Sequence, residues 1–456
     1  MTDKRTEIFE KISVWNAVCK QIIPAIASQM IALIYSLADT YFVGLLNDPS
    51  QTAGITVVSS SFLMLTAISN LFGVGGASLI ARYLGRKRPD QAGEVSSIAF
   101  WGGVVSAFLF SGIFAVLADP ILRLCGADQD SYVYAYGYAR WVIIIGGPAT
   151  ILSTLLANLI RAEGSAARAS FGVSLGGIIN VILDPIFVLP QFLGYGAVGA
   201  GMATALSNGI SVLYFLGYLY QKRDSTVISL GLGNLRHTRQ HISPLLSVGF
   251  PSAVQYGLTV VAVAAQMHFV SKYGTEAIAA LGIVKKLDQL PLYFSIGAAN
   301  GLLPLLAYNH AAGNHRRRQE AFRLGTTVSC GFSLLCFFCY ELFAPFLGGL
   351  FISDPLTREY SAAFLRLMVI AMPFMSVCYP MIIQFQAMGK ARESLICSIL
   401  RKGVIDIPLL MLMDSLLPLY GCMMVQPMVD GISLIVALSF YRRINRSLQQ
   451  QEAAAV

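Results

Sequence analysis

Long apolar runs alternate with short polar segments along the whole chain. The runs lie near residues 17–46, 52–83, 95–118, 132–160, 166–189, 196–220, 243–272, 277–308, 320–349, 358–388, 393–417 and 419–441. An α-helix rises about 1.5 Å per residue, so each run is long enough to cross the roughly 30 Å hydrocarbon core of a bilayer. The pattern therefore predicts an all-α polytopic membrane protein with twelve transmembrane helices.

The longest polar connection falls near the middle of the chain, and the two halves resemble each other. Pro24 matches Pro251, and Phe42 matches Phe269 at the same offset. The predicted parts are an N-terminal six-helix lobe (1–220), a cytoplasmic linker (221–242), a C-terminal six-helix lobe (243–446) and a cytoplasmic tail (447–456). Six spans per repeat is an even number, so the lobes share one orientation and form two pseudo-symmetric bundles. This arrangement favours alternating access over a static pore.

Charge refines this picture, because only 12% of the residues are charged and the net charge is +8. Lysines and arginines concentrate at both termini and in the loops after the even-numbered spans, for example at Lys11, Arg86, Lys222, Arg317 and Arg443. The positive-inside rule then places both termini in the cytoplasm. A nucleic-acid-binding protein would instead gather its basic residues on one continuous face, so no nucleic-acid partner is expected.

Acidic residues are rare within the predicted spans, and the first span holds a single one, Asp39. It lies in the stretch Ser-Leu-Ala-Asp-Thr-Tyr-Phe-Val-Gly, which covers residues 36–44. A carboxylate at membrane depth costs roughly 2.5–3.5 kcal/mol on insertion scales, so it normally faces a cavity or a partner. We therefore expect Asp39 to contribute to a polar site inside the bundle.

The fifth and sixth spans supply the expected partners. Asn180 and Asp184 are four residues apart and share one helix face, and Pro185 can kink the helix beside them. Spans one and five run in the same direction, and each places its aspartate roughly 10 Å below its outer end. Span six returns with Thr204 at a similar depth. We therefore predict that Asp39, Asp184 and Thr204 lie at the same depth in the membrane. Asn180 should lie one turn deeper.

Two carboxylates, an amide and a hydroxyl form an oxygen-rich site suited to H+ or to a small hard cation such as Na+. Two close carboxylates at low dielectric cannot both stay ionised without a counter-cation. Uptake of H+ or Na+ would therefore change the charge of the site and the packing of the first span. No other cofactor is expected. In the alternative interpretation, Asp39 caps a helix break and Asp184 pairs with Asn180 for packing alone.

The C-terminal half departs from this acidic pattern. The positions that align with Asp39, Asp184 and Thr204 are Gln266, Pro408 and Gln426. The remaining acidic candidates are Asp288, Asp406 and Asp430. Basic residues lie within about one turn before the first two of these, so we expect structural ion pairs there. The ion chemistry is accordingly predicted in the N-terminal half only.

Aromatic and methionine side chains are plentiful within the spans. A soft aromatic cavity would suit lipophilic or cationic small molecules through dispersion and cation–π contacts. The candidate substrate-binding residues are Tyr35, Met64, Tyr138, Gln255 and Tyr256. The alternative is that these side chains face lipid or pack helices together.

Taken together, the motifs resemble the multidrug and toxic compound extrusion (MATE) family over essentially the whole chain. They are the stretch around Asp39, Arg161-Ala-Glu-Gly164 after the fourth span, and Asn180-Val-Ile-Leu-Asp184-Pro-Ile-Phe in the fifth span. The segment 304–314 after the eighth span is similar to the MepA-like branch. The resemblance implies an antiporter of the bacterial plasma membrane that couples H+ or Na+ entry to export of drugs and organic cations.

In DinF-like relatives the coupling ion is held in the N-terminal lobe, and the resemblance places that site on Asp39, Asn180, Asp184 and Thr204. The NorM-like branch has acidic residues in the seventh and tenth spans, which this sequence lacks. We expect the chain to act as a monomer in contact with membrane lipid.

Two other functions remain open at this point. A flippase for lipid-linked saccharides would favour a basic, hydrated cavity, for which Lys285, Lys286 and Arg366 are the candidates. An intramembrane enzyme would need a nucleophile with a base, or a metal site, inside the membrane. Of the five histidines only His268 is expected within a span, so the sequence does not favour an enzyme.

Overall fold

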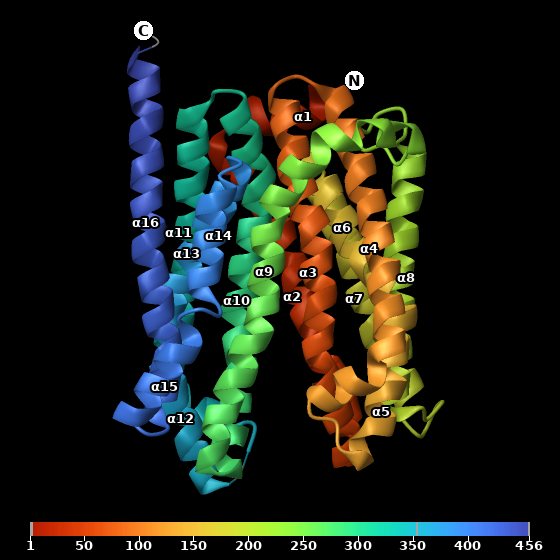
Figure 1. The fold of residues 1–456 in the computed structure, drawn as a ribbon, viewed down its shortest axis with the longest axis vertical. Helices are drawn as coiled ribbons and strands as arrows, with labels where there is room; N and C mark the ends of the chain where they lie inside the picture. The colour runs from red at the N-terminus through yellow and green to blue at the C-terminus, as the bar shows by residue number, and fades with distance from the viewer. Residues whose placement is uncertain (1–2, 353, 455–456) are drawn as a thin grey trace.

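The computed structural model describes residues 3–352 and 354–454, and it is entirely helical wherever these residues form regular structure (Figure 1). The first half contains α1 (Asp3–Glu10), α2 (Val14–Gly44), α3 (Pro49–Gly85), α4 (Pro89–Leu124), α5 (Gln129–Ala139), η1 (Arg140–Ile145), α6 (Gly147–Ala162), α7 (Ala166–Val188) and α8 (Gly196–Gln221). The second half contains η2 (Leu232–His237), α9 (Thr238–Val270), η3 (Ser271–Tyr273), α10 (Thr275–Ala311), α11 (His315–Gly349), α12 (Pro355–Val369), α13 (Ala371–Ala387), α14 (Ala391–Arg401), α15 (Asp406–Leu416) and α16 (Tyr420–Ala454).

The predicted fold class, an all-α polytopic membrane protein, is confirmed. Within the described residues, nine helices are long and apolar enough to cross a membrane, or up to eleven if each bent pair counts as one span. The bent pairs are the fourth and tenth predicted spans. The first of them, formed by α5, η1 and α6, bends by 48°, and the second, formed by α12 and α13, bends by 42°.

The eleventh predicted span differs from the continuous helix expected at 393–417. The helix stops at Arg401 and resumes at Asp406, and Gly403 between them has a φ of +117°, which L side chains rarely adopt. Its two helices have 11 residues each, which corresponds to only about 16 Å of helix. Neither piece crosses the hydrocarbon core alone.

Matching irregularities support the internal repeat. Leu117 interrupts the helical geometry of α4, and Phe343 interrupts that of α11. Asp128 caps α5 through the backbone N–H of Ser131, and Asp354 caps α12 in the same way. Both pairs are 226 positions apart (343 − 117 and 354 − 128). The two lobes therefore bend and restart their helices at equivalent places.

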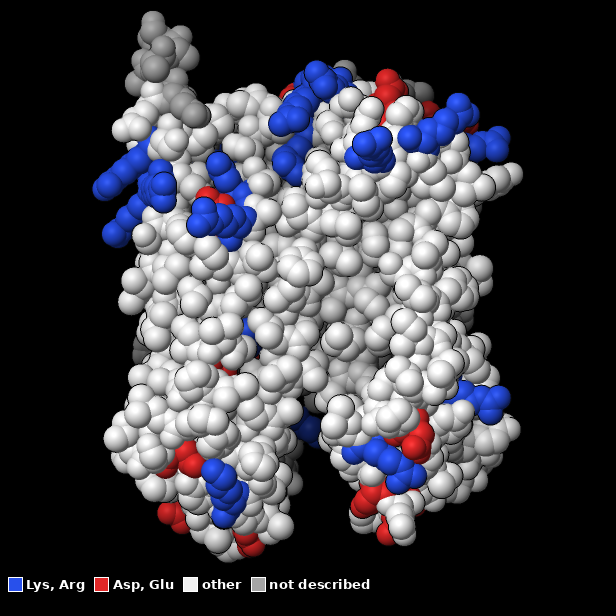
Figure 2. All heavy atoms as spheres, viewed as in Figure 1, with Lys and Arg blue, Asp and Glu red and all other residues white. Residues whose placement is uncertain are grey.

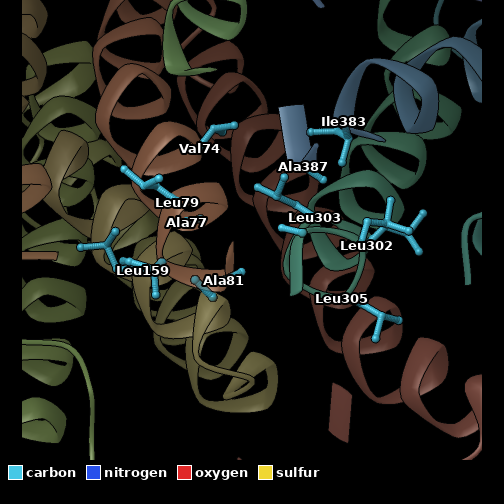
Figure 3. Close-up of a cluster of buried hydrophobic side chains, with 14 of the residues drawn as sticks. Val74, Ala77, Leu79, Ala81, Leu159, Leu302, Leu303, Leu305, Ile383 and Ala387 are labelled. Carbon is cyan, nitrogen blue, oxygen red and sulfur yellow. The ribbon is translucent and has the colours of Figure 1, made fainter. Parts of the chain in front are cut away.

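The apolar core shows how the lobes are joined. One cluster of buried side chains draws on both lobes, whereas a second lies only in the C-terminal lobe and a third only in the N-terminal lobe. Figure 3 shows part of the shared cluster, formed by Val74, Ala77, Leu79 and Ala81 of α3, Leu159 of α6, Leu302, Leu303 and Leu305 of α10, and Ile383 and Ala387 of α13. The lobes therefore share a core over one part of their length and have separate cores elsewhere.

Glycines allow close backbone contact where the lobes meet. A Cβ on Gly249 of α9 would collide with the carbonyl of Leu71 in α3, and a Cβ on Gly301 of α10 would lie 2.8 Å from the carbonyl oxygen of Gln21 in α2. Contacts under 3.0 Å are essentially never made by real Cβ atoms. The α3–α9 and α2–α10 pairs can therefore approach this closely only with glycine at these positions.

Polar contacts across the lobes lie at the same end as the start of α1. Lys87, in the α3–α4 turn, bonds Glu10 at 2.6 Å and the Tyr308 hydroxyl of α10 at 3.0 Å. His241 of α9 places Nε2 2.9 Å from a carboxylate oxygen of Glu94 in α4. Figure 2 shows lysines and arginines gathered at this end, and a hollow between the lobes that opens at the opposite end.

Candidate functional site

The structure brings the four predicted cation-site residues together from three helices of the N-terminal lobe. Thr204 of α8 donates its hydroxyl to Oδ2 of Asp39 in α2 at 3.4 Å. The Asn180 amide of α7 donates to the Thr204 hydroxyl at 3.2 Å and to Oδ1 of Asp184 at 3.5 Å. The residues predicted to share one depth thus form one hydrogen-bonded group.

All four side chains are shielded from solvent. Asp39 is 7% exposed and Asp184 is 0% exposed, while Asn180 and Thr204 are 1% and 2% exposed. One oxygen of each carboxylate, together with the Asn180 carbonyl oxygen, has no hydrogen-bond partner. Three unpartnered buried oxygens in one group are unusual in a folded protein and provide acceptors for a proton or a cation.

The site contains two carboxyl groups, and no basic residue pairs with them in the described part of the chain. The Asp39 and Asp184 carboxyl groups interact directly with each other, and the hydroxyl of Tyr138 also interacts with Asp39. Among the ion pairs of the described residues, none involves Asp39 or Asp184. Two buried carboxylates without a base cannot both be ionised unless a cation joins them.

Small residues on α7 bring the three helices together one turn before Asn180. A Cβ on Gly176 would collide with the Ser211 hydroxyl of α8, and a Cβ on Gly177 would lie 2.7 Å from the Ile31 side chain of α2. The Gly176–Gly177 pair therefore lets both neighbouring helices approach α7. The helix continues through Pro185 to Val188.

Two residues beside the site were missed by the sequence analysis. The Asn208 amide donates to the Thr204 backbone carbonyl at 3.0 Å and to the Thr150 hydroxyl of α6 at 3.1 Å. These bonds connect the site to the bent α5–α6 pair. Asn208 lies four residues after Thr204 on the same helix face, and this spacing could have identified it.

The proposed substrate residues do not form one group. Tyr138 is buried and lies against the cation site, whereas Met64 on α3 is 38% exposed. Gln255 and Tyr256 lie on α9 in the other lobe, and Tyr256 interacts with Asn70 of α3. Tyr35 lies on α2 one turn before Asp39. These five residues come from both lobes.

The C-terminal lobe contains charged residues in a different arrangement. The Arg401 Nε lies 3.0 Å from Oδ1 of Asp430, and both side chains are 1% exposed. Gln426 donates to the other oxygen of Asp430 at 2.8 Å and accepts a bond from Lys402 at 2.6 Å. The expected pairing of Asp406 with Arg401 or Lys402 was wrong, because Asp406 instead accepts the Gly403 backbone N–H at 2.6 Å.

Two of the three basic residues considered for a flippase cavity lie on the surface. Lys286 is exposed, and Arg366 lies 3.8 Å from Glu341 with both side chains about half exposed. The expected pairing of Asp288 with Lys285 or Lys286 is also absent from the ion pairs of the described residues. Only Lys285 faces the interior, and it lines a pocket.

The fold is that of a polytopic membrane protein whose two halves repeat the same helix irregularities. The MatE family model matches residues 24–186 and again residues 251–412. The two matches begin 227 positions apart (251 − 24) and end 226 apart (412 − 186). The chain therefore belongs to the MatE family of membrane transporters, and it is not an enzyme.

Individual relatives agree with this assignment. The chain is 27% identical to the multidrug export protein MepA of Staphylococcus aureus (strain N315) over 438 residues, which cover 96% of each protein. Its fold matches the outward-facing conformation of a multidrug resistance MATE family transporter of the MOP superfamily with a TM-score of 0.91, at 23% identity and over 99% of this chain and 100% of that chain. It matches a structure of MATE in complex with MaD3S over the same shares, also with a TM-score of 0.91 and 23% identity.

The second family match also revises one alignment between the lobes. At the offset of 226, Asp184 corresponds to Leu410 rather than to Pro408, and Asn180 corresponds to Asp406. Gln266 remains the counterpart of Asp39 at the offset of 227. The C-terminal lobe therefore lacks both aspartates of the site but has a carboxylate in place of its amide.

Proposed function

We propose that the protein is a cation-coupled antiporter that exports lipophilic or cationic drugs by alternating access. The single observation that carries this proposal is the pair of buried carboxyl groups of Asp39 and Asp184, which hydrogen bonds link through Thr204 and Asn180. No basic residue pairs with either of them in the part of the chain that the structure describes. Asp39, Asn180, Asp184 and Thr204 hold H+ or Na+ as a transported ion. The multidrug export relatives support a drug as the exchanged cargo.

Coupling follows from the charge of the pair. With a proton or Na+ bound, the two carboxyl groups can remain adjacent in a dry site, and α2 can stay packed on α7 through Asp39. Without the cation, repulsion between two carboxylates favours hydration or separation of these helices. Ion binding and release therefore change the packing of α2, which also contacts α10 of the other lobe.

The direction of transport follows from the charge distribution. The basic end of the molecule faces the cytoplasm of a bacterial cell under the positive-inside rule, which places both termini inside. The hollow between the lobes then opens to the exterior (Figure 2). The described conformation corresponds to a carrier that releases its cargo outside and takes up its coupling ion there.

Flux through proteoliposomes tests the proposal. Purified protein is reconstituted, a proton gradient or a sodium gradient is imposed separately, and transport of a fluorescent cationic dye is recorded. Wild-type protein should respond to one of the gradients, and Asp39→Asn should reduce gradient-driven flux at least about tenfold because the cation no longer neutralises a charged pair. Undiminished flux by this variant would refute the coupling site.

The matched control is Asp119→Asn in the same lobe. Asp119 forms an exposed ion pair with Arg123, 2.9 Å away on the same helix. Removing it should leave gradient-driven flux near the wild-type rate, because surface pairs contribute little. Equal losses in both variants would indicate a general effect of removing acidic residues.

A further inference from the structure

The bent pair of α5 and α6 contains a π-helix at its bend. This π-helix, η1, covers Arg140–Ile145, and the Gly146 backbone N–H donates to the Trp141 carbonyl five residues earlier at 2.8 Å. π-Helical turns are rare and occur frequently at functional sites. The other bent pair, α12 and α13, bends by a similar angle but has no π-helix in its described residues. The π-helix therefore belongs to the lobe that contains the acid pair of Asp39 and Asp184.

The bend packs closely against α8, next to Thr204. A Cβ on Gly146 would lie 2.7 Å from the Cβ of Ala205, the residue that follows Thr204. A Cβ on Gly201, one turn earlier on α8, would lie 3.2 Å from the Cβ of Trp141. Glycine at both positions permits these approaches, so α8 and the bend have little room to move independently.

Polar contacts attach both arms of the bend to the same site. Before the bend, the Tyr138 hydroxyl of α5 interacts with the Asp39 carboxyl group. After the bend, the Thr150 hydroxyl of α6 accepts a hydrogen bond from the Asn208 side-chain amide of α8 at 3.1 Å. The same amide group also donates to the Thr204 backbone carbonyl at 3.0 Å. Asn208 therefore connects the residue that bonds Asp39 to the arm beyond the bend.

Among the described residues, the equivalent bend of the C-terminal lobe lacks this connection. Ser376 of α13 corresponds to Thr150 at the offset of 226. Its hydroxyl donates at 2.8 Å to the Pro373 carbonyl of the same helix, and no hydrogen bond joins it to another helix within the described residues. The Thr150 hydroxyl makes the same type of bond, to the Gly146 carbonyl at 3.1 Å, and has Asn208 in addition. The amide contact is thus not required to hold a bend of this kind.

We propose that Asn208 is a positioning residue of the acid pair, and that it lets the charge of this pair set the bend between α5 and α6. Repulsion between the two carboxylates displaces Thr204, and Asn208 transfers this displacement to Thr150. A bound cation removes the repulsion and restores the contacts. The inference rests on the proposed antiporter, and it adds the fourth span to α2 as an element that responds to the coupling ion.

Trp141 is a native optical reporter of the bend. The chain has three tryptophans, and the other two, Trp15 and Trp101, lie outside η1. The Trp15→Phe/Trp101→Phe protein therefore reports from Trp141 alone. Its emission is recorded for the purified full-length protein between pH 8 and pH 5 without Na+, and during a Na+ titration at pH 8.

Few other groups near the site can titrate in this range. The other titratable groups that face the acid pair are Tyr35 of α2 and Tyr138 of α5. Tyrosines ordinarily ionise near pH 10, so a change in Trp141 emission across this range reports the acid pair.

Four variants in this background separate the hydrogen bonds from packing. Asn208→Leu and Thr150→Val remove the amide and the hydroxyl at similar volume, Thr150→Ser retains the hydroxyl, and Ser376→Ala is the control in the other lobe. The first two should lose most of the cation-induced change in Trp141 emission. They should also shift its midpoint by up to about fivefold in cation concentration, because one hydrogen bond contributes about 1 kcal/mol. Thr150→Ser and Ser376→Ala should keep the change.

A full Trp141 response in Asn208→Leu would overturn the proposal, and so would equal losses in Thr150→Val and Thr150→Ser. Dye flux separates this outcome from failure of the antiporter. If the emission does not respond to cations while Asp39→Asn still abolishes gradient-driven flux of the cationic dye rhodamine 6G, the inference fails and the proposed function stands. If flux is undiminished in Asp39→Asn, both fail. A single size-exclusion peak and retained binding of rhodamine 6G show that each variant is folded.

Discussion

Both lobes bury carboxylates, but they neutralise them differently. Asp39 and Asp184 in the N-terminal lobe lie beside each other with hydroxyl and amide partners and no base. Asp430 in the C-terminal lobe is held by Arg401 at 3.0 Å, and both side chains are 1% exposed. The Arg401 guanidinium gives Asp430 a fixed counter-ion, whereas the acid pair would take up a mobile cation in the proposed antiporter. Burial alone therefore does not identify a coupling carboxylate, and the absence of a base is the more informative feature.

The Arg401–Asp430 pair also has structural support that the acid pair lacks. The Arg401 guanidinium lies 3.9 Å from the ring centroid of Tyr379 on α13, so the pair joins α13, α14 and α16. Such a site keeps its charge through a transport cycle. The comparison predicts that an Asp-to-Asn change costs much more stability at Asp430 than at Asp39.

The largest expected effect tests this contrast through stability. Asp430→Asn should lower the free energy of unfolding by about 3–5 kcal/mol, because it leaves the buried Arg401 guanidinium without its counter-ion. Asp39→Asn should cost far less or stabilise the protein, since it removes one of two repelling groups. Denaturant unfolding of both variants in the same detergent micelles measures the difference.

A double variant serves as the control for this prediction. Arg401→Met/Asp430→Leu replaces both charges with apolar groups and should recover most of the lost stability. Equal destabilisation by Asp430→Asn and Asp39→Asn would contradict the division into a structural pair and a coupling pair.

A smaller effect is expected on the pH dependence of substrate binding. Protons and a cationic substrate exchange through the acid pair in the proposed antiporter, so wild-type affinity for rhodamine 6G should fall as pH is lowered. Asp184→Asn should flatten this profile, with a change of about tenfold at the acidic end. Asp406→Asn, at a position equivalent to Asn180, should keep the wild-type profile. An unchanged profile in Asp184→Asn would count against the paired-carboxylate site.

The smallest effect concerns the contact that joins the lobes at the basic end. Hydrogen bonds from Lys87 and Tyr308 lower the pKa of Glu10 below its ordinary value of 4.5. A lowered pKa in the folded state gives stability that is fully present above the unfolded value and is lost as pH falls through the folded value. Glu10→Gln should therefore cost up to about 1 kcal/mol near neutral pH, since Lys87 is largely exposed, and the cost should disappear as pH falls through the lowered folded pKa of Glu10.

Glu7→Gln provides the comparison for this variant. Glu7 forms an ion pair with Lys11, four residues later in the chain, and this ion pair does not connect the two lobes. Thermal unfolding across pH 3–8 measures both variants. A Glu10→Gln effect that persists at the lowest pH would show that the loss is unrelated to the ionised carboxylate.

The sequence predicted the helices and the grouping of the four polar residues for identifiable reasons. Each span is apolar on most of its surface, so a single Asp39 or an Asn180–Asp184 pair stands out, and helical rise converts residue number into depth. Thr204 was placed beside Asp39 by depth alone, and the structure has them hydrogen-bonded at 3.4 Å. Their role in ion binding stays a prediction.

The sequence was less informative about which helix faces meet in the fold and about where helices break. Arg401 and Asp430 are 29 residues apart on different helices, and no local spacing pairs them in preference to Arg401 with Asp406. The break at Gly403 depends on a positive φ that a glycine permits but does not require. Many other glycines of this chain lie inside continuous helices, so the presence of a glycine alone did not distinguish a helix break from a continuous helix.

The single acid pair has a consequence for cellular energetics. A carrier that exchanges one proton for one monovalent cation in each cycle moves no net charge across the membrane. Its export step would then draw on the pH difference alone, and one pH unit would sustain an outward concentration ratio of about ten. A cell that relied on such a proton-coupled carrier would lose the protection when its medium became alkaline, even with its membrane voltage intact.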